Sequence, residues 1–154
     1  MSFSSTAIAT GIAALSISGV TVKDITAIPE NVKERDCPIL FPSPDSWMGG
    51  ANGEPSEGPT TFGTTTSRLW TFNRVYRYVY LHAPVGADRG IKAHYSEMAT
   101  NADAIITAIT TLDISDVDVK NVAIGDFGVI TDPVGSSFFG FMVDITLRER
   151  LNND

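Results

Sequence analysis

A strict alternation of side chains runs through residues 68–81, with the sequence RLWTFNRVYRYVYL. β-Branched and aromatic residues at a period of two predict a strand that packs on one face and is at least partly covered on the other. At ~3.3 Å per residue the segment would span roughly 46 Å, more than twice the length of a usual strand. We therefore expect this strand to extend beyond its own sheet and to be contacted there by another chain. The more aromatic set of alternate positions consists of Trp70, Phe72, Arg74, Tyr76, Tyr78 and Tyr80.

Two segments carry the spacing of amphipathic helices. Residues 4–17 place apolar side chains on one stripe, with Ser4 as a candidate N-cap and Gly19 placed to end the helix. Residues 89–111 follow Asp88, a second candidate cap, and repeat apolar residues at alternating spacings of four and three. This stripe should face a sheet, and it consists of Ile91, Tyr95, Met98, Ala102, Ile105, Ile109 and Leu112.

Four further segments are predicted to be strands. Residues 20–28 and 37–42 precede the long strand, and residues 117–130 and 138–147 follow the second helix. The Asp-Pro and Gly signals between the last two strands predict a hairpin reversal. The polar tail at residues 148–154 is expected to fray. In the last strand one face is apolar and carries Phe139, Phe141, Val143, Ile145 and Leu147.

The segment at residues 42–67 has no hydrophobic period and is rich in glycine, proline and threonine. Loops of this length inside a compact domain are mostly functional or disordered. Trp47, Met48 and Phe62 are costly to leave in water, which favours an arm that becomes ordered against a neighbouring subunit over a floppy insertion. Two nearby arginines are expected to pair with carboxylates across that boundary, and they are Arg68 and Arg74.

The predicted order is helix, strand, strand, arm, long strand, helix, strand, strand. Because strands outnumber helices and short reversals join them, we expect an α+β fold. Its sheet should be mixed and mainly antiparallel, with two helices packed on it. No repeat or second domain is indicated, so residues 1–154 are interpreted as a single domain with the arm at residues 42–67.

Charge and composition exclude several classes of function. The chain has 154 residues, of which 43% are hydrophobic and 19% are charged, and its formal net charge is −7. An acidic chain is a poor candidate for gripping phosphates. The single cysteine, Cys37, offers neither an internal disulfide nor a metal-ligand cluster. The first twenty residues lack a basic region, and no apolar run reaches the length of a membrane span, so we expect a soluble intracellular chain.

The sequence carries no recognisable catalytic motif. Its two histidines, His82 and His94, have no partner at metal-ligand spacing. The acidic residues between 113 and 118 lack the pattern of a calcium loop and are interpreted as a solvated turn. The tripeptide Asp-Phe-Gly at residues 126–128 occurs without other kinase elements. We therefore predict a protein that is not an enzyme and uses no cofactor and no metal ion.

A nucleic-acid-binding function remains an alternative at this point. Aromatic residues interleaved with Arg68, Arg74 and Arg77 could stack the bases of a single strand. Two features disfavour this hypothesis: the same face must serve as core if the helices cover it, and the acidic surroundings would repel a phosphate backbone.

Three segments of the chain are informative together, and they are ERDCPILFPSPD at residues 34–45, RYVYLHAPVGADRG at residues 77–90 and DFGVITDPVGSSFFGFMVDITL at residues 126–147. These segments resemble the tail terminator proteins of long-tailed bacteriophages, which complete the tail. The predicted order of elements is also similar to that class over essentially the whole chain. The resemblance implies a virion protein that is assembled in the host cytoplasm and forms a ring, usually of six subunits.

The resemblance further implies the partners of the ring. They would be the tail tube protein on one side and the head–tail connector or stopper protein on the other, with DNA passing through the lumen without specific binding. Another neck protein, such as the head-completion stopper, is the alternative within the same class. The arm at residues 42–67 is long for a tail terminator. Trp47, Met48, Phe62, Arg68 and Arg74 are the residues expected at the interface with the neighbouring subunit or the tail tube.

Overall fold

The computed structural model describes residues 5–44, 47–49, 55–61, 68–86, 91–131 and 134–153. These residues form one sheet with the strand order β1-β2-β5-β7-β6, and β3 and β4 also pair with β5. The elements are α1 (Ser5–Ala13), β1 (Thr21–Val22), β2 (Ile39–Pro42), β3 (Met48–Gly49), β4 (Pro55–Thr61), β5 (Arg68–Pro84), α2 (Ile91–Ile109), β6 (Val117–Thr131) and β7 (Ser137–Asn153).

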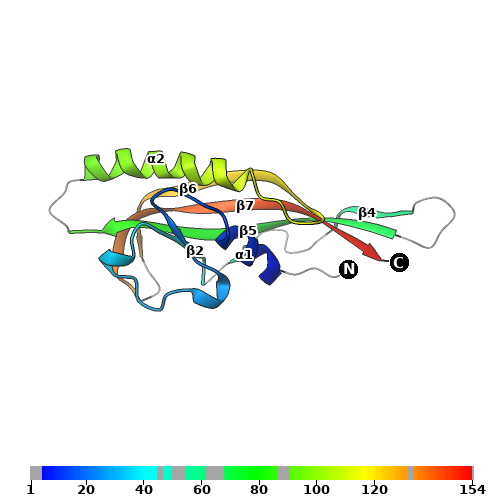
Figure 1. The fold of residues 1–154 in the computed structure, drawn as a ribbon, viewed down its shortest axis with the longest axis horizontal. Coiled ribbons are helices and arrows are strands. Elements are labelled where there is room, and N and C mark those ends of the chain that lie inside the picture. The colour runs from blue at the N-terminus through cyan, green and yellow to red at the C-terminus, as the bar shows by residue number, and fades with distance from the viewer. Residues whose placement is uncertain are drawn as a thin grey trace.

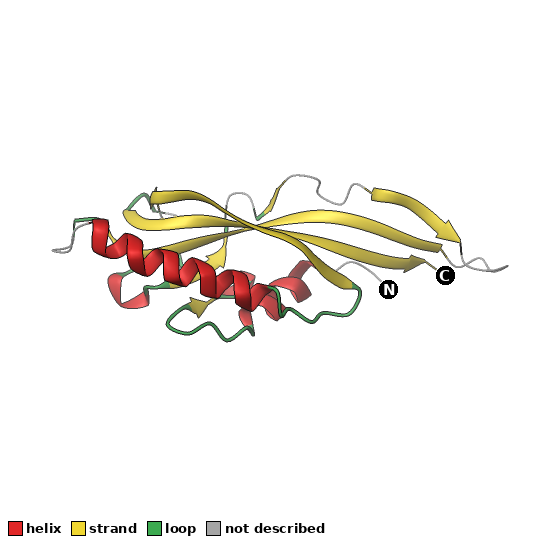
Figure 2. Cartoon of the chain, turned by 90° about the horizontal axis from the view of Figure 1, so that it is seen from above, coloured by secondary structure: helices red, strands yellow, loops and turns green. Residues whose placement is uncertain are grey.

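The predicted fold class is confirmed. The short β1 runs parallel to β2, and the other paired strands are antiparallel, so the sheet is mixed and mainly antiparallel. Both helices lie on one side of the sheet, with α2 running along the strands (Figure 2). Neither helix in the described part of the chain is long and apolar enough to cross a bilayer.

The long strand is the centre of the sheet. β5 has 17 residues and pairs with β7, also of 17 residues, from Arg68 opposite Asn153 to Pro84 opposite Phe138. At the other flank β5 pairs in turn with β2, β3 and β4. β4, β5 and β7 continue past the end of α2 (Figure 1). The expectation that this strand extends beyond its own sheet is wrong, because β7 pairs with β5 along its whole length and β4 pairs with its first residues. The predicted contact with another chain stays a prediction.

The core lies between the helices and the sheet. The helical phase predicted for α2 is confirmed, because Met98, Ile105 and Ile109 are fully buried whereas Thr107 is exposed. A second, smaller cluster covers the opposite face of the sheet and consists of Val32, Ile39, Phe41, Val79, Leu81 and Phe138. The helix-side cluster includes Ile8, Ile12, Tyr76, Tyr78, Tyr80, Phe139, Phe141, Val143, Ile145 and Leu147.

Three predicted boundaries are wrong. α1 ends at Ala13 rather than at residue 17, and the positive φ of Gly19 belongs to a later turn. The strand predicted at 20–28 is only two residues long, because Asp24 accepts a hydrogen bond from the backbone of Ile25 and begins a 3₁₀ turn. Residues 148–153 do not fray, since they continue β7 against β5. Ser4 and Asp88, the predicted caps, lie outside the described residues.

Parts of the predicted arm form strands. Within residues 42–67 the described pieces include β3 and β4, and both pair with β5 of the same chain. The β4 pairing contains two register irregularities, between Pro55 and Glu57 and between Glu57 and Thr60. These pieces are therefore ordered against their own chain, whereas the order expected for the arm came from a neighbouring subunit, and that contact between subunits stays a prediction. Backbone hydrogen bonding to an available strand edge explains how a segment without a hydrophobic period forms strands.

The packing of α2 gives a stability prediction. Ile105→Ala should lower the free energy of unfolding by about 2–5 kcal/mol, because it opens a cavity in the helix-side core. Thr107→Ala, on the exposed face of the same helix, should change it by less than about 0.5 kcal/mol. Urea denaturation of both variants measures the difference, and similar losses at both positions would contradict the observed phase.

Candidate functional site

A buried ion pair crosses the two long strands on the helix side of the sheet. Arg74 of β5 donates two hydrogen bonds to Glu149 of β7, from Nε and Nη2, each 2.6 Å long. The hydroxyl of Tyr76 lies 3.0 and 3.2 Å from the two carboxylate oxygens of Glu149. The side chains of Arg74 and Glu149 are only 10% and 3% exposed. The pair is therefore removed from water, and its bidentate geometry satisfies most of its polar atoms.

The electrostatics of this cluster favour the charged pair. The hydrogen bond to Glu149 is the largest cause of the raised pKa of Arg74, so the guanidinium stays protonated. Burial, followed by the charge of Glu149, raises the pKa of Tyr76, so the phenol stays neutral. The predicted pairing of Arg74 across a subunit boundary is wrong, because its carboxylate partner lies in the same chain. The register explains this, since it places Glu149 diagonally across from Arg74 on the same face.

The other predicted interface residues do not form one cluster. Trp47 is half-buried and packs on Tyr76, with ring centroids 5.1 Å apart. Met48 pairs with Tyr76 through the backbone of β3. Arg68 begins β5, roughly 20 Å along the strand from Arg74. Phe62 lies outside the described residues. The structure thus brings Trp47 and Arg74 into contact with Tyr76, places Met48 opposite Tyr76 in the strand register, and separates Arg68 from them.

A second ion pair lies on the opposite face of the same strands. Arg77 donates from Nε to Asp144 over 2.8 Å, and the two side chains are 38% and 36% exposed. The backbone N–H of Arg77 donates to the carbonyl of Trp47 over 2.6 Å. This pair is directly opposed in register, unlike the diagonal pair of Arg74. Because both side chains are partly exposed to water, we expect this ion pair to contribute little to the stability of the fold.

The fold brings both histidines together, which their sequence spacing did not indicate. The register between β5 and β7 shifts between Leu81 and Ala83, so His82 is the extra residue of a β-bulge. Gly140 lies opposite this bulge, where a Cβ atom would collide with the carbonyl of Tyr80. A bulge re-aims side chains, and here it accompanies a buried His82 that faces α2.

The histidine cluster continues into α2. His82 Nε2 lies 2.9 Å from Oε2 of Glu97, and its Nδ1 lies 2.7 Å from the hydroxyl of Tyr80. Asn101, one turn after Glu97, donates to the same hydroxyl over 2.6 Å. His82, His94 and Glu97 each offer one ligand atom, and these atoms lie within 4.8 Å of one another. Imidazole nitrogens and a carboxylate oxygen are common metal ligands, so these three side chains are able to hold a metal ion.

His94 is the unusual member of this cluster. It is 3% exposed, it stacks on Phe139 with centroids 4.9 Å apart, and its ring lies edge-on to His82 at 5.5 Å. Neither of its ring nitrogens has a hydrogen-bond partner among the described residues. Leaving a buried polar group unpaired costs about 1–3 kcal/mol, so such a group calls for an explanation.

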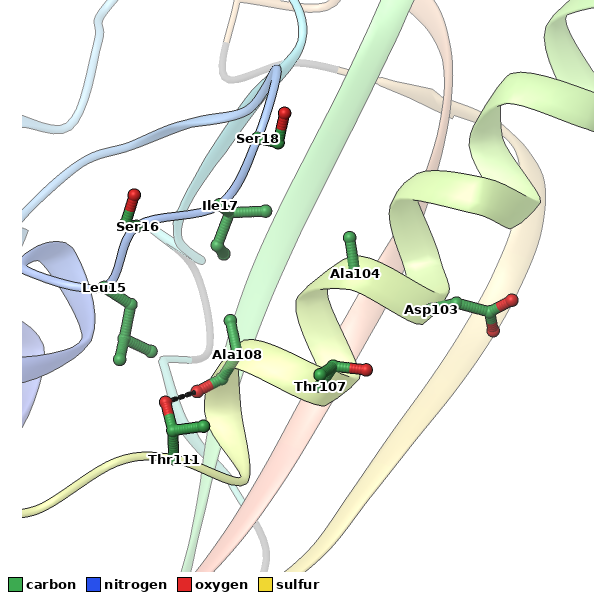
Figure 3. Close-up of a pocket in the computed structure, with 9 residues that line it drawn as sticks. All are labelled: Leu15, Ser16, Ile17, Ser18, Asp103, Ala104, Thr107, Ala108 and Thr111. Carbon is green, nitrogen blue, oxygen red and sulfur yellow. Dashed lines mark hydrogen bonds between the residues drawn. The ribbon is translucent and has the colours of Figure 1, made fainter.

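The depression in Figure 3 offers little catalytic chemistry. It lies between α2 and residues 15–18, and Asp103 is the one ionisable side chain among its lining residues. That carboxylate points away from residues 15–18 (Figure 3), and Thr111 is engaged with the carbonyl of Ala108. Elsewhere, burial raises the pKa of the Cys37 thiol to about 12, so this cysteine is a weak nucleophile near neutral pH.

Three tyrosines on the aromatic face of β5 belong to the core and cannot serve as a stacking platform. Tyr76, Tyr78 and Tyr80 are fully buried under the helix side of the sheet. Bases therefore have no access to these three rings, so they cannot contribute to single-strand binding. The acidic turn also has an internal partner, because Asp118 pairs with Arg150 of β7.

Two surfaces of the sheet are suited to contacts with other chains. The first is the distal ribbon, defined here as residues 55–61, 68–71 and 150–153, which lies beyond the start of β6 at Val117. The second is the edge strand β6, whose outer side pairs with no other described strand. Three exposed valines lie at the hairpin end of the sheet, and they are Val85, Val129 and Val134.

Comparison with known proteins adds no relative. No protein-family model matches the chain, and no curated protein matches it.

The two ion pairs give a matched stability prediction. Glu149→Gln should lower the free energy of unfolding by about 3–5 kcal/mol, because it leaves the buried Arg74 without a counter-charge. Asp144→Asn makes the same chemical change on the same strand and should cost less than about 1 kcal/mol, because water screens its pair. Chemical denaturation compares the two variants. Equal losses of unfolding free energy in the two variants would show that burial does not make the Arg74–Glu149 pair more important for stability than the Arg77–Asp144 pair.

Proposed function

We propose that this chain is the subunit of a tail terminator, a structural ring that closes the head-proximal end of a phage tail tube. The observation that carries the proposal is the distal ribbon. Its strands extend past α2 (Figure 1), so the helices that cover the rest of the sheet do not cover this part. A hydrogen-bonded ribbon of this length is suited to packing against another subunit.

The edges of the sheet support ring formation. A closed ring of identical subunits requires two different surfaces that complement each other, so that each subunit contacts the next in the same way. The distal ribbon and the hairpin end with its exposed valines lie at opposite ends of the sheet. This arrangement suits a head-to-tail contact between neighbours, in which the ribbon of one subunit meets the hairpin end of the next.

The charge of the chain also supports a conduit for DNA. Six copies would carry a formal charge of −42, which is six times the −7 of one chain. Cationic walls would hold phosphates and obstruct the passage of DNA, whereas an acidic ring does not retain it. In the described residues the arginines Arg74, Arg77 and Arg150 are paired with carboxylates of the same chain.

A deletion tests the role of the distal ribbon. Removing residues 52–64 and joining the ends with a short Gly-Ser linker deletes β4 but keeps Trp47, whose packing on Tyr76 belongs to the core. The truncated chain should fold with a cooperative transition and fail to join tails to heads. The matched control is Thr107→Ala in the full chain, which alters an exposed helical position and should assemble normally. A truncated chain that still completes tails would contradict the proposal.

Image reconstruction of a particle that contains the protein tests its position. We expect density for a ring in contact with the last ring of the tail tube, with the distal ribbon at a contact between subunits or with the tube. Contact only with the portal side would instead identify a head-completion stopper. Salt-sensitive micromolar binding to oligonucleotides, with no ring in the particle, would favour the nucleic-acid alternative.

A further inference from the structure

We propose that His82, His94 and Glu97 bind a divalent transition-metal ion, of which zinc is the best match, and that the ion fastens α2 to the bulge of β5. The proposal is independent of the tail terminator assignment, because it concerns the inside of one subunit. It rests on the ligand set, on the unpartnered His94 and on the support of His82 by Tyr80.

The ligand types and spacing fit zinc. Imidazole nitrogen and carboxylate oxygen are common zinc ligands, at about 2.0–2.2 Å from the metal. Two ligand atoms of a tetrahedral site are therefore about 3.3 Å apart. Nε2 of His82 and Oε2 of Glu97 are 2.9 Å apart, and all three ligand atoms lie within 4.8 Å of one another. His94 and Glu97 are three residues apart on α2, so they project from the same side of the helix.

His94 supplies the independent observation. His94 is 3% exposed and its ring contacts Phe139 and His82, yet neither ring nitrogen has a hydrogen-bond partner among the described residues. One of these nitrogens lies within reach of the ligand atoms of His82 and Glu97. A metal ion at that point would use the lone pair that the protein itself leaves unpaired. If the ring of His94 served only to fill space in the core, an apolar ring such as that of phenylalanine would stabilise the fold more, because it has no polar atoms to leave unpaired.

The surroundings of His82 suit a metal ligand. Metal-binding histidines commonly donate their second ring N–H to a supporting oxygen, which fixes the tautomer. Metal binding requires Nε2 of His82 to be unprotonated, so the remaining ring proton lies on Nδ1 and is donated to the hydroxyl oxygen of Tyr80. Asn101 donates to the same oxygen and fixes its position.

The fourth position of the site can be occupied by water. Glu97 is exposed, whereas the two histidines are buried, so the carboxylate lies at the entrance to the cluster. A depression beside it is lined by His82, Glu97 and Asn101, among other residues. Three protein ligands and one water molecule complete a tetrahedral shell.

Calorimetric titration of the chelator-treated, tag-free full chain with zinc chloride tests the proposal. We expect one zinc ion per chain with a Kd of about 1 μM or tighter. Zinc at about a hundredfold above the Kd should raise the unfolding midpoint by roughly 5–10 °C. Absence of a 1:1 site, or a midpoint that zinc does not raise, would overturn the proposal.

Two variants separate this site from adventitious binding. His94→Phe keeps a ring stacked on Phe139 and should fold at least as stably without metal, but it should weaken zinc binding at least about 100-fold. Glu97→Gln keeps a hydrogen-bonding side chain near His82 and should weaken zinc binding at least about tenfold. The matched control is Asp103→Asn, which removes an exposed carboxylate from the same helix and should leave the affinity unchanged. Unchanged affinity in His94→Phe or Glu97→Gln, or an equal loss in Asp103→Asn, would refute the assignment.

Discussion

The antiparallel pairing of β5 with β7 is the interaction on which the rest of the structure depends. It joins two strands of 17 residues each and aligns their buried alternate positions under the helices. The same register sets Glu149 diagonal to Arg74 and Asp144 opposite Arg77. A slip by one residue would move every apolar side chain to the wrong face and separate both ion pairs, so the register is strongly specified.

The bulge at His82 is the one irregularity in the pairing of β5 with β7, and the core before it differs in kind from the histidine cluster at it. Before the bulge the strands alternate regularly, and their helix-side residues form the tyrosine and aliphatic core. At the bulge His82 is the extra residue, and it meets His94 and Glu97 of α2. At the opposite end, beyond β6, the strands leave the helical layer as the distal ribbon. One pair of strands therefore carries the core, the proposed metal site and the proposed assembly surface.

Much of the fold could be predicted from the sequence, because periodicity reports burial directly. The alternation in β5 and the stripe of Met98, Ile105 and Ile109 give the strand and the helical face that the structure shows. The pairing of β4 with β5 could not be predicted, since backbone hydrogen bonds require no hydrophobic period. The intrachain partner of Arg74 and the meeting of His82 with His94 depend on strand register and on a bulge. The only sequence signal for that bulge is Gly140, because a Cβ atom there would collide with the carbonyl of Tyr80. This glycine indicates a bulge only when the pairing of β5 with β7 is already known.

Hydrogen exchange measured by mass spectrometry on the free chain and on assembled particles tests most directly whether the distal ribbon is the assembly surface. In both states, amides of β5 at residues 76–81 should exchange slowly, because both faces of the sheet are covered there. Amides of the distal ribbon should exchange faster in the free chain and become protected in the particle. Equal exchange of the distal ribbon in the two states would contradict the account.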